Sequence, residues 1–213
     1  MKTDDLIMML SSGPDLRPAP RPLTASLLPL SAGLLASVVL MLVLLGVRSD
    51  LAQATALPAF WLKVSFSALL ACAGWLAAKR LAAPGARTAA LPLYLGAPVV
   101  ALWCVAAILL WQAGPEARTP LFWGATWRYC PLLIALLSMP LFVAALRVMR
   151  SLAPTRLRLA GAAAGFAAGA TAALVYCLHC PEMSPVFVGF WYLLGMLIPT
   201  ALGALIGRRV LAW

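Results

Sequence analysis

Six long apolar stretches fill most of this chain and leave it few ways to fold. Hydrophobic residues make up 64% of the sequence and charged residues 10%, whereas soluble domains carry about 25% charged residues. A bilayer accommodates such stretches, because about 20 apolar residues cross it as a helix. Inside lipid, each backbone polar group must find a partner within its own segment. The sequence therefore predicts an all-α membrane protein with six transmembrane helices.

The predicted helices form one transmembrane domain, residues 26–213, preceded by a short helix and a Pro-rich tether in residues 1–25. Each predicted span ends near a basic, glycine or proline residue, as membrane helices commonly do. The spans are 27–47, 60–78, 91–111, 129–146, 159–178 and 186–206.

Basic residues indicate the orientation of the helices, because Lys and Arg collect on the cytoplasmic side of a membrane. Twelve of them are predicted on one side of the membrane: Lys2, Arg17, Arg21, Lys79, Arg80, Arg87, Arg147, Arg150, Arg156, Arg158, Arg208 and Arg209. The other side has four: Arg48, Lys63, Arg118 and Arg128. Both termini are therefore expected in the cytoplasm. The net charge of +10 is explained by this distribution and does not require nucleic acid as a direct partner.

The fifth span is rich in small residues. Gly161, Gly165 and Gly169 recur every four residues and so share one face of the helix. Small residues at this spacing let helix backbones approach closely. We expect this face to pack against another helix of the same bundle rather than against a second copy.

The segment before the first span has the pattern of a short amphipathic helix. Thr3 is a predicted N-cap, and two aspartates in the first turn favour the helix dipole. Apolar side chains then share one face, and residues 11–14 end the helix. Such a helix docks on a membrane surface or in a partner's groove, and the aspartates disfavour anionic lipid. The expected partner-binding residues are Thr3, Asp4, Asp5, Leu6, Ile7, Met9 and Leu10.

Soft and reactive side chains gather at the outward-facing side. Cys177, His179, Cys180 and Glu182 lie in the gap after the fifth span, and Cys130 opens the fourth span on the same side. A redox-active disulfide within the Cys-x-x-Cys pair is one expectation. A soft-metal site of Cys130, His179 and Cys180 is a second. A disulfide from Cys130 to one of the pair is a third.

Glu182 has two alternative roles in this gap: it orients His179, or it is a solvated loop acid. Cys72 and Cys104 lie in the middle of predicted spans, where cysteine behaves as a small packing residue. No Asp or Glu falls within a span, and no phosphate-binding loop, HExxH motif or Ser-His-Asp set is present. We therefore expect a non-enzymatic protein with no resident cofactor, for which a soft metal ion would be a transient signal.

Several segments together resemble the NrsF family of six-helix bacterial anti-sigma factors. They are the opening residues 1–7, residues 127–130 (Trp-Arg-Tyr-Cys), residues 178–182 (Leu-His-Cys-Pro-Glu), residues 190–195 (Phe-Trp-Tyr-Leu-Leu-Gly) and the final Gly-Arg-Arg of residues 207–209. The most specific of these is the Leu-His-Cys-Pro-Glu segment that leads into the helix with Trp and Tyr. The similarity covers most of the chain.

The resemblance implies a multi-pass protein of the bacterial inner membrane, surrounded by lipid, that holds an extracytoplasmic-function sigma factor inactive. It also implies release of that factor on a heavy-metal or oxidative signal, with two periplasmic-side cysteines that correspond to Cys130 and Cys180. Cys177 corresponds to no family position. Two alternatives remain open at this point: a thiol oxidoreductase that uses membrane quinone, and a soft-metal transporter.

Overall fold

The structure is a computed structural model that describes residues 3–12, 24–83 and 85–212. Every regular element in these residues is a helix, and six of the helices are long and apolar enough to cross a membrane. The helices are α1 (Thr3–Ser11), α2 (Thr24–Leu44), α3 (Leu51–Ala54), α4 (Pro58–Ala82), α5 (Leu91–Gln112), α6 (Pro115–Trp123), α7 (Cys130–Ser151), α8 (Leu157–Tyr176), α9 (Pro185–Phe187), the π-helix η1 (Val188–Tyr192) and α10 (Leu193–Val210). The predicted all-α fold with six helices of membrane-spanning length is confirmed.

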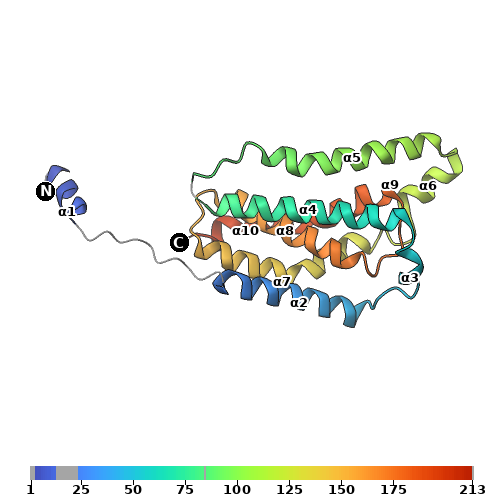
Figure 1. The fold of residues 1–213 in the computed structure, drawn as a ribbon, viewed down its shortest axis with the longest axis horizontal. Coiled ribbons are helices and arrows are strands. Elements are labelled where there is room, and N and C mark those ends of the chain that lie inside the picture. The colour runs from blue at the N-terminus through green and yellow to red at the C-terminus, as the bar shows by residue number, and fades with distance from the viewer. Residues whose placement is uncertain (1–2, 13–23, 84, 213) are drawn as a thin grey trace.

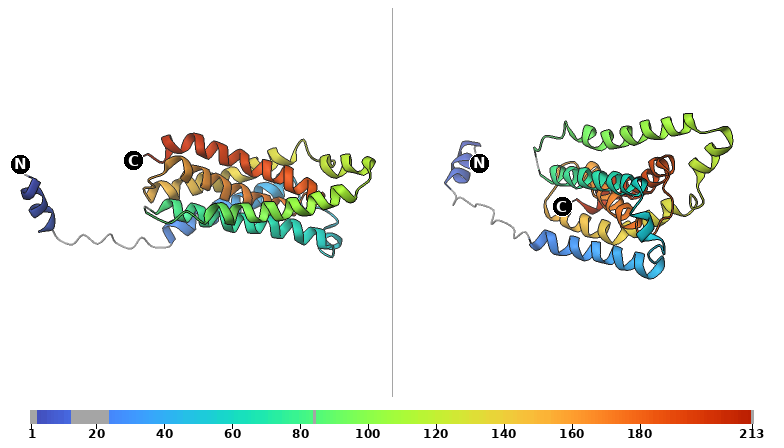
Figure 2. Two further views of the ribbon diagram at one scale, coloured as in Figure 1. Left: turned by 90° about the horizontal axis from the view of Figure 1, so that it is seen from above. Right: turned by 45° about the vertical axis from the view of Figure 1, so that its right-hand side comes forward.

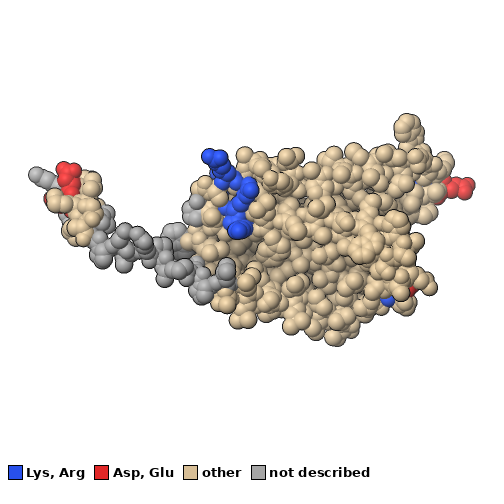
Figure 3. Space-filling model, in the orientation of Figure 1, with Lys and Arg blue, Asp and Glu red and all other residues tan. Residues whose placement is uncertain are grey.

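The six long helices lie side by side and alternate in direction (Figures 1 and 2). We call the end where α2 starts and α10 finishes the basic end, and the opposite end, with α3, α6 and the start of α7, the cysteine end. Figure 3 shows basic side chains gathered at the basic end, whereas the acidic side chains visible on the bundle lie toward the cysteine end. The charge asymmetry predicted from the sequence is therefore present in the folded bundle.

Helix α8 lies at the centre of the bundle. It packs against α10, α4 and α7, and most of its residues are buried. Its alanine and glycine side chains are small, so three neighbours can approach the same helix. By contrast, α5 packs mainly on α4, α9 and η1 and stands apart from the other helices in Figure 1.

The glycine face of α8 packs against α10. A Cβ atom placed on Gly161 would collide with the backbone of Gly203, and one on Gly165 would collide with the backbone of Pro199. One on Gly169 would lie 2.9 Å from Cγ of Pro199 and 3.0 Å from Cα of Met196. The expectation that these glycines pack within the bundle is confirmed.

Helix boundaries differ from the predicted ones by a few residues. The first span starts and ends three residues earlier than predicted, and α7 continues to Ser151 rather than ending at residue 146. This extension places Arg147 and Arg150 in the last turns of α7, where positive charge is favourable to the helix dipole. The loops predicted at the cysteine end also contain two short helices, α3 and α6.

The amino-terminal helix α1 has the predicted type and ends as predicted near Ser11. Thr3 is itself helical, and the residues before it lie outside the described part of the chain. The Pro-rich tether and the side chain of Leu10 lie outside the described residues.

Substitution of Gly165 tests the close contact between α8 and α10. We expect Gly165→Val to destabilise the protein by about 2–3 kcal/mol or more, because the new side chain must displace the Pro199 backbone. Thermal unfolding in detergent measures the effect. Gly96→Val in α5 is the matched control, since nothing lies within 4 Å of a Cβ there. Equal unfolding midpoints for the two variants would contradict the proposed packing.

Candidate functional site

The three cysteines of the cysteine end are buried, and their thiols are free. Cys130 is the first residue of α7, Cys177 is the C-cap of α8, and Cys180 follows in the same turn. The amides of Cys180 and His179 both donate to the carbonyl of Tyr176, at 3.0 Å. This continued turn keeps the chain compact beyond the end of α8 and presents Cys180 to Cys130, whose thiol donates a hydrogen bond to it.

Lys63 is the residue that organises this site. It lies in the second turn of α4, is completely buried, and donates from Nζ to the carbonyls of Cys180 at 2.8 Å and Glu182 at 3.0 Å. The rings of Phe60 and Tyr192 lie 5.8 and 6.0 Å from the ammonium. A buried cation is expensive unless it is well paired, so these contacts fix the backbone of the Cys180 segment against α4.

A second cation reaches the same carbonyl from the linker after α2. Arg48 donates from Nη1 to the Cys180 carbonyl at 3.2 Å, and its other nitrogens bind both carboxylate oxygens of Asp50 at 2.7 Å. The Arg48 amide also donates to the carbonyl of Leu178 at 3.1 Å. The turn that carries Cys180 is therefore held from two sides, by α4 and by the α2–α3 linker.

His179 and Glu182 bind to backbone groups. Nδ1 of His179 lies 3.0 Å from the carbonyl of Gly46, and the Glu182 carboxylate accepts the Ala125 N–H at 2.7 Å. Gly124, with φ of 56°, leaves room for that carboxylate, because a Cβ there would lie 2.8 Å from its atoms. The Glu182 carboxylate thus holds the α6–α7 turn, whereas the contact of His179 is to Gly46.

Among the described residues, no group of three or more His, Cys, Asp or Glu side chains is arranged to hold a metal ion. The set predicted from the sequence, Cys130, His179 and Cys180, is thus not assembled in this conformation, because the imidazole is directed to Gly46. The remaining cysteines, Cys72 and Cys104, are exposed on the outer faces of their helices. They do not pack inside the bundle, contrary to expectation.

The two cysteines after α8 differ in acidity. The hydrogen bond from Cys130, together with the charge of Lys63, outweighs burial and lowers the pKa of Cys180 from 9.0 to about 6. Burial raises the pKa of Cys177 from 9.0 to about 11. The Cys177 thiol donates to the carbonyl of Ala173 at 3.3 Å and lies 3.8 Å from Oγ of Ser67. Since thiolates are the reactive form, Cys180 is the more readily ionised of the two thiols.

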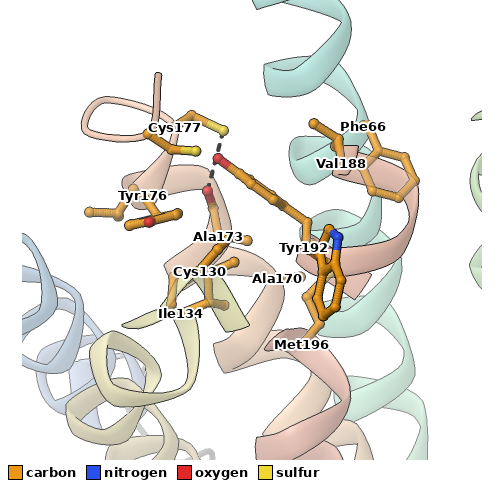
Figure 4. Packing of buried hydrophobic residues seen from close by; sticks show 14 of the residues in the cluster. Phe66, Cys130, Ile134, Ala170, Ala173, Tyr176, Cys177, Val188, Tyr192 and Met196 are labelled. Atoms are coloured by element: carbon orange, nitrogen blue, oxygen red, sulfur yellow. Dashed lines mark hydrogen bonds between the residues drawn. The ribbon is translucent and has the colours of Figure 1, made fainter. Parts of the chain in front are cut away.

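Tyr192 extends from η1 toward Cys177 at the centre of this cluster (Figure 4). Its buried hydroxyl makes no hydrogen bond of standard geometry, but it acts on the thiols of Cys177 and Cys180 and lowers the pKa of both. It belongs to a π-helical turn, and such turns are frequent at functional sites. The hydroxyl is placed to donate to a thiolate or an oxidised sulfur when one forms beside it.

Sequence reasoning missed the role of Lys63 and counted it only as a charge at the mouth of a span. The signal was present, because Lys63 is the one charged residue inside the predicted span 60–78, and an ionisable residue within a membrane span is a functional candidate by default. The roles of Arg48 and Tyr192 were missed as well. Their partners are distant in sequence, so no local pattern marks them.

The predicted partner-binding residues lie on α1. Leu6, Ile7, Met8 and Met9 expose between 41% and 67% of their surface. Such a continuous apolar surface on a short helix is typical of a segment that binds in a groove.

Residues 13–213 match the protein family described as "NrsF: Negative regulator of sigma F". The chain belongs to the NrsF family. It is 53% identical over 213 residues to "Probable anti-sigma-F factor NrsF" of Azospira oryzae, with both chains covered completely. It is 37% identical over 215 aligned residues to "Anti-sigma-F factor NrsF" of Caulobacter vibrioides, again over the full length of both. No solved structure matches the chain.

The comparisons confirm the resemblance inferred from residues 127–130, 178–182 and 190–195. The NrsF description and both relatives' names denote a regulator rather than an enzyme. This agrees with the prediction of a non-enzymatic protein and sets aside the quinone-dependent oxidoreductase.

The Lys63 ammonium beside Cys180 predicts how alkylation of the Cys180 thiol depends on pH. The thiolate fraction of Cys180 rises as pH increases through its pKa, so alkylation of Cys180 should have its midpoint near pH 6. Lys63→Met removes the neighbouring charge and should raise this midpoint by about one unit or more. Peptide-resolved mass spectrometry after iodoacetamide treatment measures it, and Lys79→Met at the basic end is the control. An unchanged midpoint in Lys63→Met would show that Lys63 does not act on the thiol.

Proposed function

We propose that this chain is an inner-membrane anti-sigma factor that binds an extracytoplasmic-function sigma factor at the cytoplasmic face. Family membership supports the anti-sigma role. The charge asymmetry supports an orientation with the basic end in the cytoplasm. The basic end has nine Lys and Arg residues in the described part of the chain: Lys79, Arg80, Arg87, Arg147, Arg150, Arg156, Arg158, Arg208 and Arg209.

We infer that α1 is a main contact for the sigma factor. The chain leaves the bundle at the start of α2, on the basic end, so the segment before it emerges on the same side as the nine basic residues. A nine-residue helix is marginal by itself in water, and burial of its apolar side chains in a groove would stabilise it. Asp4 and Asp5 in its first turn disfavour an anionic membrane surface as the alternative site.

Leu6→Glu tests this contact. Burial of one leucine contributes about 1.5–3 kcal/mol, so its loss together with a buried charge should weaken the complex tenfold or more. Transcription from a promoter that depends on the sigma factor should rise in the absence of any signal. Ser12→Glu, beyond the end of α1, is the control for added charge. Full repression by Leu6→Glu at normal protein levels would exclude α1 as a main contact.

The sensing part of the proposal is carried by one observation: the low-pKa thiol of Cys180 lies buried against Cys130 and Lys63 at the end opposite the basic one. A peroxide would oxidise the Cys180 thiolate to a sulfenic acid, take up a proton and leave as water or an alcohol. The Cys130 thiol would then form a disulfide with Cys180 and release water. A thiophilic metal ion would instead bind both sulfurs as thiolates and displace the proton of Cys130.

Either reaction would couple to the basic end through the packed helices. Cys130 begins α7 and Cys180 follows α8, so a bond between them changes how these two helices meet. Helix α8 contacts α10 backbone to backbone along its glycine face, so there is little free space between the two helices. Release of the partner requires a difference in affinity between two states. About 3–5 kcal/mol, a hundredfold or more in affinity, would be sufficient.

Serine substitutions test what each cysteine of the cysteine end contributes to the transcriptional response. We expect Cys130→Ser and Cys180→Ser to repress normally and to lose about tenfold or more of the transcriptional response to peroxide or Cd²⁺, because neither variant can join the two sulfurs. Reporter transcription with and without each agent measures the response. Cys177→Ser should respond like the parent protein, since Cys177 is protonated and buried.

The Cys72→Ser, Cys104→Ser double variant is the control for general thiol loss, because both residues lie on the outer faces of their helices. A normal response from Cys180→Ser would rule out the sensor. A response lost for peroxide but kept for Cd²⁺ would restrict the sensed signal to oxidants.

A further inference from the structure

Three hollows meet at the basic end of the bundle, and Arg156 lines all of them. The first is an apolar crevice of about 350 Å³ between α4, α5 and α8, with Leu95, Ala162 and Phe166 among its walls. The second, about 210 Å³, is polar and lies under the α4–α5 loop beside Arg80 and Thr88. The third, about 300 Å³, is lined by Arg158 and Arg208. One continuous depression thus joins an apolar slot to a basic mouth.

The basic mouth has no acidic counterpart in the described residues. The ion pair between Arg48 and Asp50 lies at the other end of the bundle. Arg80 donates to the carbonyl of Arg87 at 3.3 Å, which directs its guanidinium under the loop. The amino-terminal end of α8 at Arg156 also has no side-chain cap and no acidic residue in its first turn. Within the described residues, the positive potential at the mouth is therefore uncompensated.

The apolar slot exists because α5 is not packed against α8. It touches α4 and, at the cysteine end, α9 and η1. The gap that remains lies at membrane depth and is walled by side chains such as Leu81, Leu91 and Leu159. A polar ligand would find no hydrogen-bond partner among these apolar side chains, whereas a hydrocarbon chain can fill the space between α5 and α8.

We propose that this depression is a binding site for an anionic phospholipid of the surrounding membrane. One acyl chain occupies the slot between α4, α5 and α8. The phosphate lies at the mouth, where Arg80, Arg156 and the Thr88 hydroxyl can donate to it. Basic pockets between transmembrane helices are suited to such headgroups. The lipid bridges the α4–α5 and α7–α8 loops, so it fixes the position of α5 at the basic end, independently of the thiol site.

Lipid retention tests the site. The full-length protein, purified in detergent, is titrated with phosphatidylglycerol and with phosphatidylcholine and examined by native mass spectrometry. We expect preferential retention of phosphatidylglycerol and a retention about fivefold lower in Arg156→Gln. Arg147→Gln, at the same end but outside the three hollows, should retain lipid like the parent protein. Ala162→Leu, which fills the slot, should also lower retention.

The variants' unfolding midpoints in lipid-free detergent separate binding from folding. They should match the parent, and phosphatidylglycerol should raise the midpoint of the parent but not that of Arg156→Gln. If Arg156→Gln and Arg147→Gln lower the retention of phosphatidylglycerol equally, general surface charge explains the effect and the proposal is overturned. Equal stabilisation by inorganic phosphate would assign the mouth to a free anion, and equal retention of phosphatidylcholine would exclude headgroup recognition. Both outcomes overturn it as well.

Discussion

The rest of the structure depends on the small side chains of α8. Its faces consist largely of glycine and alanine, so α10 approaches it until Gly161 and Gly203 are in backbone contact. Helices in lipid gain little from the hydrophobic effect, and close packing is what holds them together. A larger side chain at these positions would push α10 outward. The position of every element that follows α8, including the turn with Cys180, rests on this contact.

The cysteine end is held in a different way, by charge. Two cations, the buried Lys63 and the partly buried Arg48, converge on the carbonyl of Cys180, and the Glu182 carboxylate holds the turn before α7. In a low-dielectric setting the hydrogen bonds of buried Lys63 are strong, and a lost partner is costly. The arrangement is therefore rigid while it is intact. A reaction at the thiol would disturb several strong contacts together, which is what a two-state device requires.

Much of this site could be predicted from residue order. The segment from Cys177 to Glu182 and its alignment with Cys130 follow from span lengths, since each helix must cross the same thickness. The roles within the segment could not be predicted. His179 binds the carbonyl of Gly46 and Glu182 binds Ala125, and neither partner is near in sequence. Lys63 was visible as a charge in an apolar span, but its partners were not.

The sequence by itself determined that this chain forms six membrane-length helices, which end of the bundle is basic, and that three cysteines share the other end. Hydrophobic length and charge are local properties, so they can be counted along the chain. The tertiary structure alone decided which thiol is acidic, that Lys63 fixes the turn, and that α5 leaves a slot beside α8. These features depend on distances between segments far apart in sequence, and only packing sets such distances.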